Sequence, residues 1–152
     1  IGSHKENPMM LTACDWYNIF VDQQKQVRKG DKKSGKWHVV VDQSGTYEFE
    51  LRRWPVESGY GLNDAVPATK VTDGILIPGV SFPIASAKIM VGDQEQSIKI
   101  DPTDKSARFT FEVKAGETSI YTLFEDAEGK RIVGAYYLYV NRTSSKKELS
   151  KK

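Results

Sequence analysis

Two segments of the chain show the residue pattern of β-strands most clearly. In GTYEFELRRWP, residues 45–55, large apolar side chains alternate with charged ones, which is the period-two pattern of a strand with one buried and one wet face. The segment VGAYYLYV, residues 133–140, is rich in Tyr and Val and is apolar on both faces. A strand of this second kind is expected in the middle of a covered sheet.

Short apolar runs of the same kind recur along the whole chain, separated by turns that contain Gly, Pro or Asp. Strands are expected at Met9–Ala13, Trp37–Asp42, Thr46–Arg53, Ala85–Gly92, Gln96–Ile100, Ala107–Lys114, Ser119–Glu125 and Arg131–Asn141. Evenly spaced short strands with tight turns predict an all-β fold, an antiparallel β-sandwich of jelly-roll type. The predicted core contains Trp37, Val39, Tyr47, Phe49, Leu51, Ile89, Val91, Phe109, Phe111, Ile120, Tyr136 and Leu138.

Two stretches depart from the strand pattern. Residues 56–83 are rich in Gly and Pro and are longer than a usual connection in a compact domain, so a long irregular loop that is either functional or disordered is expected there. The apolar run at 75–77 and Val80 predict that this loop packs against something. Residues 15–27 can hold a short helical segment of about one turn, with Asp15 as its N-cap.

Length and composition suit a single domain. The 152 residues are 39% hydrophobic and 28% charged, as in ordinary globular proteins. We divide the chain into a leader or purification remnant at 1–6, the β-sandwich domain at 7–142 and a flexible basic tail at 143–152. Because the first residue is Ile1 and not Met, we interpret the chain as part of a longer protein.

Charge and cysteine content exclude several function classes. A net charge of +2 is too small to predict nucleic-acid binding, and the basic residues of the tail and of the loop at 29–36 are interpreted as solvated. A single cysteine excludes an internal disulfide and any multi-cysteine zinc site. No apolar run approaches the roughly 18 residues of a membrane span.

The amino-acid sequences of several segments resemble those of a known family. LTACDWYN (11–18), GKWHVVVDQSG (35–45), RRWP (52–55) and GAYYLYV (134–140) are similar to the C-terminal β-rich region of bacterial arylsulfatase-like hydrolases of the sulfatase family. The resemblance covers most of the chain from Asn7 to about Arg142, and RRWP and GAYY are its most specific parts.

This resemblance implies a non-catalytic C-terminal domain that packs on the catalytic domain of the same polypeptide. The missing catalytic domain would carry calcium and a formylglycine, made from Cys or Ser in a Cys/Ser-x-Pro-x-Arg motif. Neither Cys14 nor Ser81 of this chain stands in that motif, since Cys14 is followed by Asp-Trp-Tyr and Ser81 by Phe-Pro-Ile-Ala. The parent protein would be a sulfuric ester hydrolase in the periplasm or at the cell surface.

Catalysis within this chain is not expected, and we predict no catalytic residue, no metal ligand and no cofactor. A nucleophile needs a neighbouring base, but His38 lies inside a strand and is expected to face water. Cys14 follows an apolar strand and is predicted to be a small core residue. The turn at Asp101–Asp104 could hold calcium, but a plain turn is favoured.

Residues at the end of the strand at 46–53 are the candidates for contact with substrate or with another domain. Alternation places Arg53 on the core side, and Arg52 and Trp54 on the outer side where the long loop begins. A guanidinium can donate two parallel hydrogen bonds to a sulfate group, and an indole can pack on a sugar ring. Tyr137 and Tyr139 share the second face of the last strand, which is either roofed by the loop or the missing domain, or is a sugar-binding platform.

Two hypotheses therefore remain open. In the first, the chain is the non-catalytic domain of a sulfatase-like hydrolase and lends residues to the rim of its substrate cleft. In the second, it is a carbohydrate-binding module for glycans, sulfated or not. Both use a β-sandwich, so the fold cannot separate them.

Overall fold

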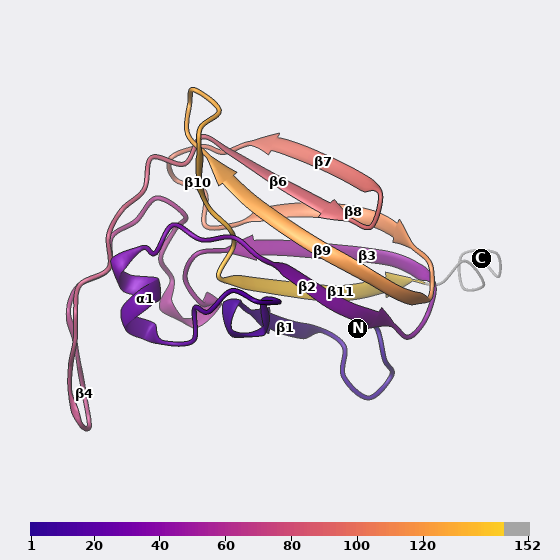
Figure 1. Ribbon diagram of the computed structural model, residues 1–152, viewed down its shortest axis with the longest axis horizontal. Coiled ribbons are helices and arrows are strands. Elements are labelled where there is room, and N and C mark those ends of the chain that lie inside the picture. The colour runs from indigo at the N-terminus through magenta and orange to yellow at the C-terminus, as the bar shows by residue number, and fades with distance from the viewer. Residues whose placement is uncertain (145–152) are drawn as a thin grey trace.

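The computed structural model describes residues 1–144, which form two antiparallel β-sheets packed face to face (Figure 1). The first sheet has the order β1 (Met9–Thr12), β11 (Tyr137–Ser144), β3 (Gly45–Arg52), β8 (Ala107–Val113). The second has the order β10 (Arg131–Val133), β9 (Gly116–Glu125), β6 (Ser86–Val91), β7 (Gln94–Lys99), and β2 (Lys36–Val41) also pairs with β9. The predicted all-β, jelly-roll-like sandwich is confirmed.

Strand alternation places the core between the sheets. On β3, Tyr47, Phe49 and Leu51 point inward and are fully buried. Phe49 stands opposite Phe109 on β8 and packs edge-on against Phe111, with ring centroids 5.7 Å apart, a geometry that aromatic pairs favour. All the predicted core residues are buried except Val39, which is half-buried.

The last predicted strand, Arg131–Asn141, is two strands in different sheets. β10 pairs with β9 in the second sheet, whereas β11 pairs with β1 and β3 in the first. Residues 134–136 carry the chain between the layers, and the Gly134 amide donates to the carbonyl oxygen of Lys33 at 2.9 Å. A Cβ at Gly134 would lie 3.0 Å from Trp16, so glycine permits this close crossing.

Both ends of the described chain contact the sheets. The Ile1 ammonium donates to the Val40 carbonyl oxygen at 2.7 Å, and the Asp42 amide donates to the Ile1 carbonyl oxygen at 2.9 Å. Ile1 is therefore paired with the end of β2. At the other end Thr143 and Ser144 belong to β11, and the rest of the predicted basic tail lies outside the described residues.

The helical segment begins later than expected. α1 spans Gln24–Lys29, and the Gln26 side chain accepts hydrogen bonds from the amides of Asp22 and Gln23 at its start. Asp15 does not cap it, and lies instead in the 3₁₀ turn η1 (Ala13–Asp15), where its carboxylate accepts the Thr12 amide at 3.3 Å. The prediction of Asp15 as the helix cap was wrong, because a turn at Tyr17 and Asn18, with φ of 58° at Asn18, and an irregular stretch at 19–22 separate η1 from α1.

The long loop at 56–83 folds over one end of the sandwich. It contains the 3₁₀ turn η2 (Val56–Ser58) and a ribbon of β4 (Thr69–Val71) and β5 (Gly74–Leu76) that projects from the body (Figure 1). Leu62, Val66 and Phe82 are buried, whereas Ile75 and Val80 are exposed. Packing of the loop is thus confirmed, mainly through residues other than those expected, of which Leu76 and Ile77 are half-buried. No helix in the described part of the chain is long and apolar enough to cross a membrane.

Candidate functional site

The outer face of the four-stranded sheet carries two neighbouring rows of side chains close to the long loop. The first row, across β1, β11 and β3, is Thr12, Tyr137 and Arg52. The second row, across all four strands, is Met10, Tyr139, Glu50 and Arg108. Directly opposed residues of antiparallel strands have Cβ atoms about 4.5–5.5 Å apart. These seven side chains therefore form one surface, which we call the tyrosine face.

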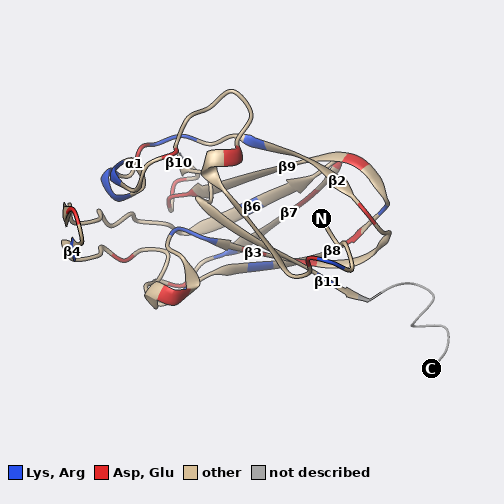
Figure 2. Ribbon diagram, turned by 90° about the horizontal axis from the view of Figure 1, so that it is seen from below, with Lys and Arg blue, Asp and Glu red and all other residues tan. Residues whose placement is uncertain are grey.

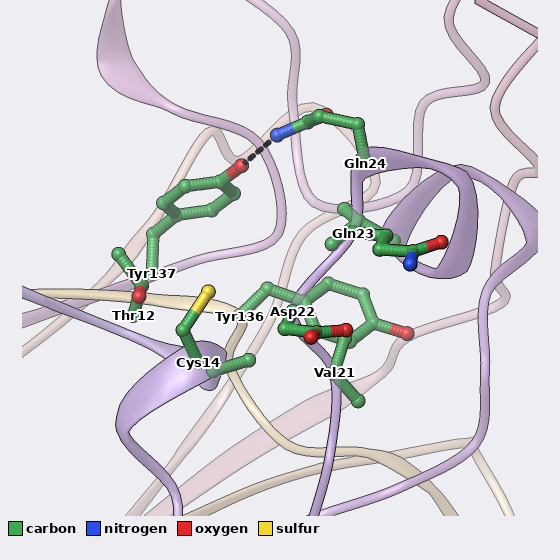
Figure 3. Close-up of a pocket in the computed structure, with 10 residues that line it drawn as sticks. Thr12, Cys14, Val21, Asp22, Gln23, Gln24, Tyr136 and Tyr137 are labelled. Carbon is green, nitrogen blue, oxygen red and sulfur yellow. Dashed lines mark hydrogen bonds between the residues drawn. The ribbon is translucent and has the colours of Figure 1, made fainter.

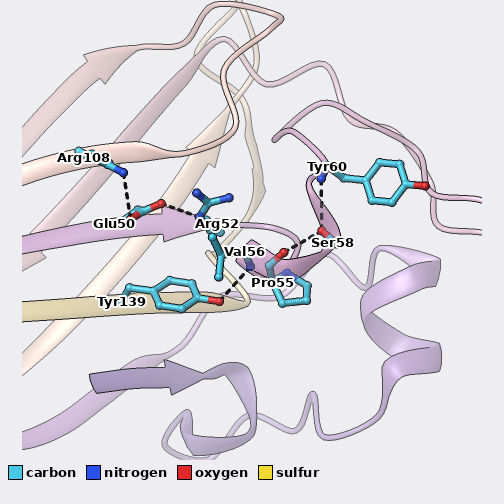
Figure 4. Close-up of polar contacts among 8 residues, drawn as sticks. All are labelled: Glu50, Arg52, Pro55, Val56, Ser58, Tyr60, Arg108 and Tyr139. Carbon is cyan, nitrogen blue, oxygen red and sulfur yellow. Dashed lines mark hydrogen bonds and ion pairs between the residues drawn. The ribbon is translucent and has the colours of Figure 1, made fainter. Parts of the chain in front are cut away.

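Arg52 is held at this face through one nitrogen only. Its Nε donates to Oε1 of Glu50 at 2.5 Å, and Nη2 of Arg108 lies 3.5 Å from the other carboxylate oxygen (Figure 4). Only 8% of the Arg52 side chain is exposed, against 62% for Arg108. Within the described residues, the two terminal nitrogens of Arg52 have no hydrogen-bond partner. They are fixed in position and can donate together to a ligand.

Tyr139 joins the tyrosine face to the long loop. Its hydroxyl accepts a hydrogen bond from the Val56 amide at 3.1 Å, where η2 begins (Figure 4). The Ser58 hydroxyl in the same turn donates to the Pro55 carbonyl oxygen at 2.7 Å and accepts from the Tyr60 amide at 3.3 Å. The long loop thus contacts the second face of the last strand at the Tyr139 hydroxyl.

A cavity of about 160 Å³ adjoins the first row, between η1, α1 and the start of β11 (Figure 3). A cavity of about 150 Å³ is large enough for a six-membered ring. Its lining is apolar on one side and polar on the other, and consists of Thr12, Ala13, Cys14, Val21, Asp22, Gln23, Gln24, Val27, Tyr136 and Tyr137.

Tyr137 is shared between the cavity and the tyrosine face. Gln24 Nε2 donates to its hydroxyl at 2.9 Å, which leaves the hydroxyl hydrogen available to a further acceptor (Figure 3). Burial raises the pKa of Tyr137, so the hydroxyl stays protonated at neutral pH. Tyr136 is more deeply buried and donates to the Asp31 carbonyl oxygen at 2.7 Å. Of the two tyrosines, Tyr137 is thus the one that can serve a ligand.

Arg53 lies on the core side, as predicted, but serves the loop. Its Nη1 and Nη2 donate to the carbonyl oxygens of Leu62 at 3.2 Å and Val80 at 2.7 Å. If Arg53 did not contact substrate, a carboxylate had been expected as its partner, but these two partners are backbone carbonyl groups. The guanidinium carbon lies 4.7 Å from the Trp54 ring centroid and 4.3 Å from that of Phe82. Burial lowers the pKa of Arg53 to about 10, so it remains charged at neutral pH. Its side chain is fully buried and offers no surface to substrate.

The outward position predicted for Trp54 was wrong. The side chain is 4% exposed, and its Nε1 donates to the Asp64 carbonyl oxygen at 3.0 Å. β3 ends at Arg52, so strand alternation does not extend to Trp54, and the long loop brings Gly79 onto the indole. Trp54 is therefore a packing residue within this domain.

Cys14 and His38 lie on different elements, η1 and β2. The Cys14 thiol is exposed and lines the cavity, so its prediction as a core residue was wrong. η1 turns its side chain outward while Ala13 takes the buried position. His38 is exposed, as expected, and its ring meets Tyr17 edge-on at 4.9 Å.

In the turn at Asp101–Asp104, both carboxylates accept hydrogen bonds from within the turn. Asp101 accepts hydrogen bonds from the amide and the hydroxyl of Thr103, and these bonds lower the pKa of the Asp101 carboxyl. Asp104 accepts the Asp101 amide at 2.8 Å. Among the described residues there is no group of three or more His, Cys, Asp or Glu that could hold a metal ion.

Sequence reasoning found Arg52, Tyr137 and Tyr139 but missed Thr12, Gln24 and the cavity. The Thr12 position could have been inferred from its place at the end of an expected strand. Gln24 could not, because nothing local to the segment 19–24 indicates that it packs against β11, more than 100 residues away.

No family model and no curated protein matches the chain. Among solved structures, it is similar to a ruminal GH26 endo-β-1,4-mannanase, with 12% identity and a TM-score of 0.46 over 93% of this chain and 27% of that chain. A carbohydrate-binding module of Cellvibrio mixtus lichenase 5A, solved with cellotriose, has 13% identity and a TM-score of 0.46 over 91% and 100%. A Podospora anserina β-(1,4)-mannanase of the GH26-CBM35 type has 9% identity and a TM-score of 0.44 over 92% and 28%.

The chain thus spans about a quarter of the length of the two mannanase structures. Similarities at these identities and TM-scores establish no function for this chain. The assignment to the β-sandwich class rests on its own strand order and pairing.

Proposed function

We propose that this domain is a non-catalytic carbohydrate-binding module and that its ligand lies on the tyrosine face and in the adjoining cavity. The observation that carries the proposal is the position of Tyr137. It stands between Arg52, whose terminal nitrogens are free within the described residues, and a cavity of about 160 Å³ with Gln24 and Asp22 at its wall.

This arrangement suits a sugar for two chemical reasons. A pyranose ring has apolar C–H surfaces that pack on aromatic rings, and the half-buried Tyr139 provides such a ring on β11, whereas Tyr137 is only 8% exposed and offers mainly its hydroxyl and ring edge. The ring also carries hydroxyl groups that both donate and accept. Arg52 and Gln24 supply donors, and Glu50 and Asp22 supply acceptors.

Membership of a sulfatase-like hydrolase is the second proposal, and it is supported by the sequence resemblance alone. The segment RRWP, its most specific part, contributes Arg53 and Trp54 to the packing of this domain's own loop, which leaves Arg52 as the residue able to reach a substrate cleft. If a parent hydrolase exists, the carbohydrate site would bring its substrate close to the catalytic domain, and an exported location would be expected.

The test is direct binding of soluble oligosaccharides and polysaccharides to the purified chain, by calorimetry or affinity electrophoresis. For a glycan that binds, Arg52→Ala should weaken the affinity about 10- to 100-fold, because charge-assisted hydrogen bonds contribute about 1.5–3 kcal/mol. The matched control is Arg131→Ala, which removes an exposed arginine on β10 of the other sheet, away from the tyrosine face, and should leave the affinity unchanged.

A second variant separates the cavity from the sheet. Gln24→Ala removes the partner of the Tyr137 hydroxyl and opens one wall of the cavity, and it should weaken binding while leaving the melting temperature close to that of the wild type. If no glycan in a broad panel binds, or if Arg52→Ala and Gln24→Ala both bind as the wild type does, the proposed site is wrong.

A further inference from the structure

The segment that follows the cavity wall is strongly basic. Residues 25–36 contain Lys25, Arg28, Lys29, Lys32, Lys33 and Lys36, and Asp31 is the only acidic residue among them. All five lysines are exposed. In Figure 2 the ribbon is blue, the colour of Lys and Arg, over much of α1 and the chain that leads from it toward β2. We call these five lysines the basic segment.

Most of this charge is not neutralised by the protein. Arg28 is used internally, since its Nη1 donates to the carbonyl oxygens of Pro67 at 3.1 Å and Ile77 at 2.9 Å. Within the described residues the lysines of the basic segment form no ion pair, and the salt bridges lie on β3, β8 and around Lys88. Like charges held close together create a positive potential that attracts anions over about 10 Å.

Two exposed aromatic rings are fastened to the same segment. Phe20 is 76% exposed, and its carbonyl oxygen accepts hydrogen bonds from Lys33 Nζ and Gln26 Nε2, both at 3.2 Å. Tyr17 is 63% exposed, and its amide donates to the Lys36 carbonyl oxygen at 2.9 Å. These are the two most exposed aromatic side chains described, and each is anchored to the basic segment through its backbone.

The basic segment is also continuous with the carbohydrate site. α1 begins at Gln24, which lines the cavity together with Val27 one turn later. At the far end of the helix, the Asp31 carbonyl oxygen accepts the hydroxyl hydrogen of Tyr136, another residue of the cavity wall. Lys25 and Lys29 therefore lie on the helix that forms one wall of the cavity.

We infer that the ligand of this domain is an acidic polysaccharide, whose sugar rings bind at the cavity and the tyrosine face and whose sulfate or carboxylate groups bind the basic segment. This inference rests on the proposed carbohydrate function and specifies its ligand class. An acidic glycan is favoured over nucleic acid because the chain as a whole has a net charge of only +2 and because the cavity and the Arg52–Glu50 pair present partners for hydroxyl groups.

The experiment compares one neutral polysaccharide backbone with its chemically sulfated derivative and with a polyuronate, using the whole chain. The sulfated or the carboxylated polymer should bind at least about 10-fold more tightly than the neutral one, and this difference should shrink steeply between about 50 and about 200 mM salt. A preference between the two acidic polymers identifies which anionic group is recognised.

Charge-reversal variants locate the effect. Lys25→Glu, Lys29→Glu and Lys32→Glu in one protein should remove the advantage of the acidic polymers and leave binding of the neutral backbone unchanged. The matched control reverses Lys99, Lys114 and Lys130, which are exposed on other elements, and should behave as the wild type does. Equal losses in the two triple variants would show that only net charge matters and would overturn the inference.

Two further outcomes separate this inference from the proposed function. If neutral and acidic glycans bind equally well and Arg52→Ala abolishes both, the carbohydrate site stands and the acidic specificity fails. If the basic segment binds duplex DNA or vesicles of anionic lipid more tightly than any acidic glycan, the inferred ligand class is wrong. If no glycan of any charge binds, both proposals fail together.

Discussion

Arg52 and Arg53 show how one position along a strand decides the role of a side chain. Arg52 is the last residue of β3 and points to the outer face, where Glu50 holds its Nε. Arg53 lies just beyond the strand and is enclosed between two aromatic rings and two backbone carbonyl groups. A buried cation needs such partners, and although its Nε has none, Arg53 is committed to the fold, whereas Arg52 is available for binding.

At the residue scale, truncating Trp54 should destabilise the isolated domain. Trp54→Ala removes a buried indole and its hydrogen bond to Asp64, and the free energy of unfolding should fall by about 3–5 kcal/mol. Arg108→Ala, at an exposed position, should change it by less than about 0.5 kcal/mol. Denaturant unfolding of both variants is the measurement. A loss below about 1 kcal/mol for Trp54→Ala would mean that the indole packs against something other than this domain.

Also at the residue scale, buried tyrosines should make the fold sensitive to alkali. Burial raises the pKa of Tyr47, Tyr136 and Tyr137. Above about pH 10 the unfolded chain loses tyrosine protons that the folded chain keeps, so the unfolded state binds fewer protons and the free energy of unfolding falls as pH rises. The lowered pKa of Arg53 acts in the opposite direction.

The variant Tyr136→Phe isolates the tyrosine contribution to this pH dependence. It removes one protected hydroxyl, so its free energy of unfolding should fall less steeply between about pH 10 and about pH 11.5 than that of the wild type. Tyr17→Phe, at an exposed position, is the control. Unfolding curves recorded across this pH range are the measurement. Equal slopes for the wild type and Tyr136→Phe would show that the Tyr136 hydroxyl does not contribute to the pH dependence.

At the element scale, the long loop is fixed by a few tight contacts. Val66 and Gly79 exchange backbone hydrogen bonds of 3.1 and 2.8 Å, and this bridge lies on the Trp54 ring. A Cβ at Gly79 would lie 2.4 Å from Trp54 Cη2 and 2.4 Å from Val66 Cγ2. The absence of a side chain at this position is therefore what allows the loop to close over the end of the sandwich.

Gly79→Ala should accordingly loosen the loop without unfolding the sheets. Overpacking of this kind costs about 1–3 kcal/mol, and hydrogen exchange at the Val66 and Gly79 amides should accelerate while the β3 amides stay protected. Gly59→Ala is the control, because its φ of 72° disfavours alanine but nothing lies within 4 Å of the added Cβ. Unchanged protection at Val66 and Gly79 in the first variant would contradict the packing described here.

At the scale of the whole molecule, the domain should bind without catalysing. Neither Cys14 nor Ser81 stands in a sulfatase nucleophile motif, and the described residues hold no metal-binding cluster. We therefore expect no turnover of a chromogenic aryl sulfate by the purified chain. Hydrolysis that persists through further purification and is lost in Cys14→Ala would contradict this expectation.

The sequence by itself determined most of the strands of this protein and which of their faces are buried. Period-two alternation is a local property of each strand. The side chains of β3, β8 and β6 that face the core could therefore be assigned before the neighbouring strands were known. The outward positions of Arg52, Tyr137 and Tyr139 follow from the same alternation.

Only the tertiary structure decided what happens beyond the strand ends. The burial of Trp54 depends on Gly79, the packing of Ile1 depends on β2, and the cavity depends on α1 meeting β11. Each is a contact between segments far apart along the chain, and no local residue pattern encodes it, because the free energy that fixes it comes from surfaces that meet only when the sandwich has formed.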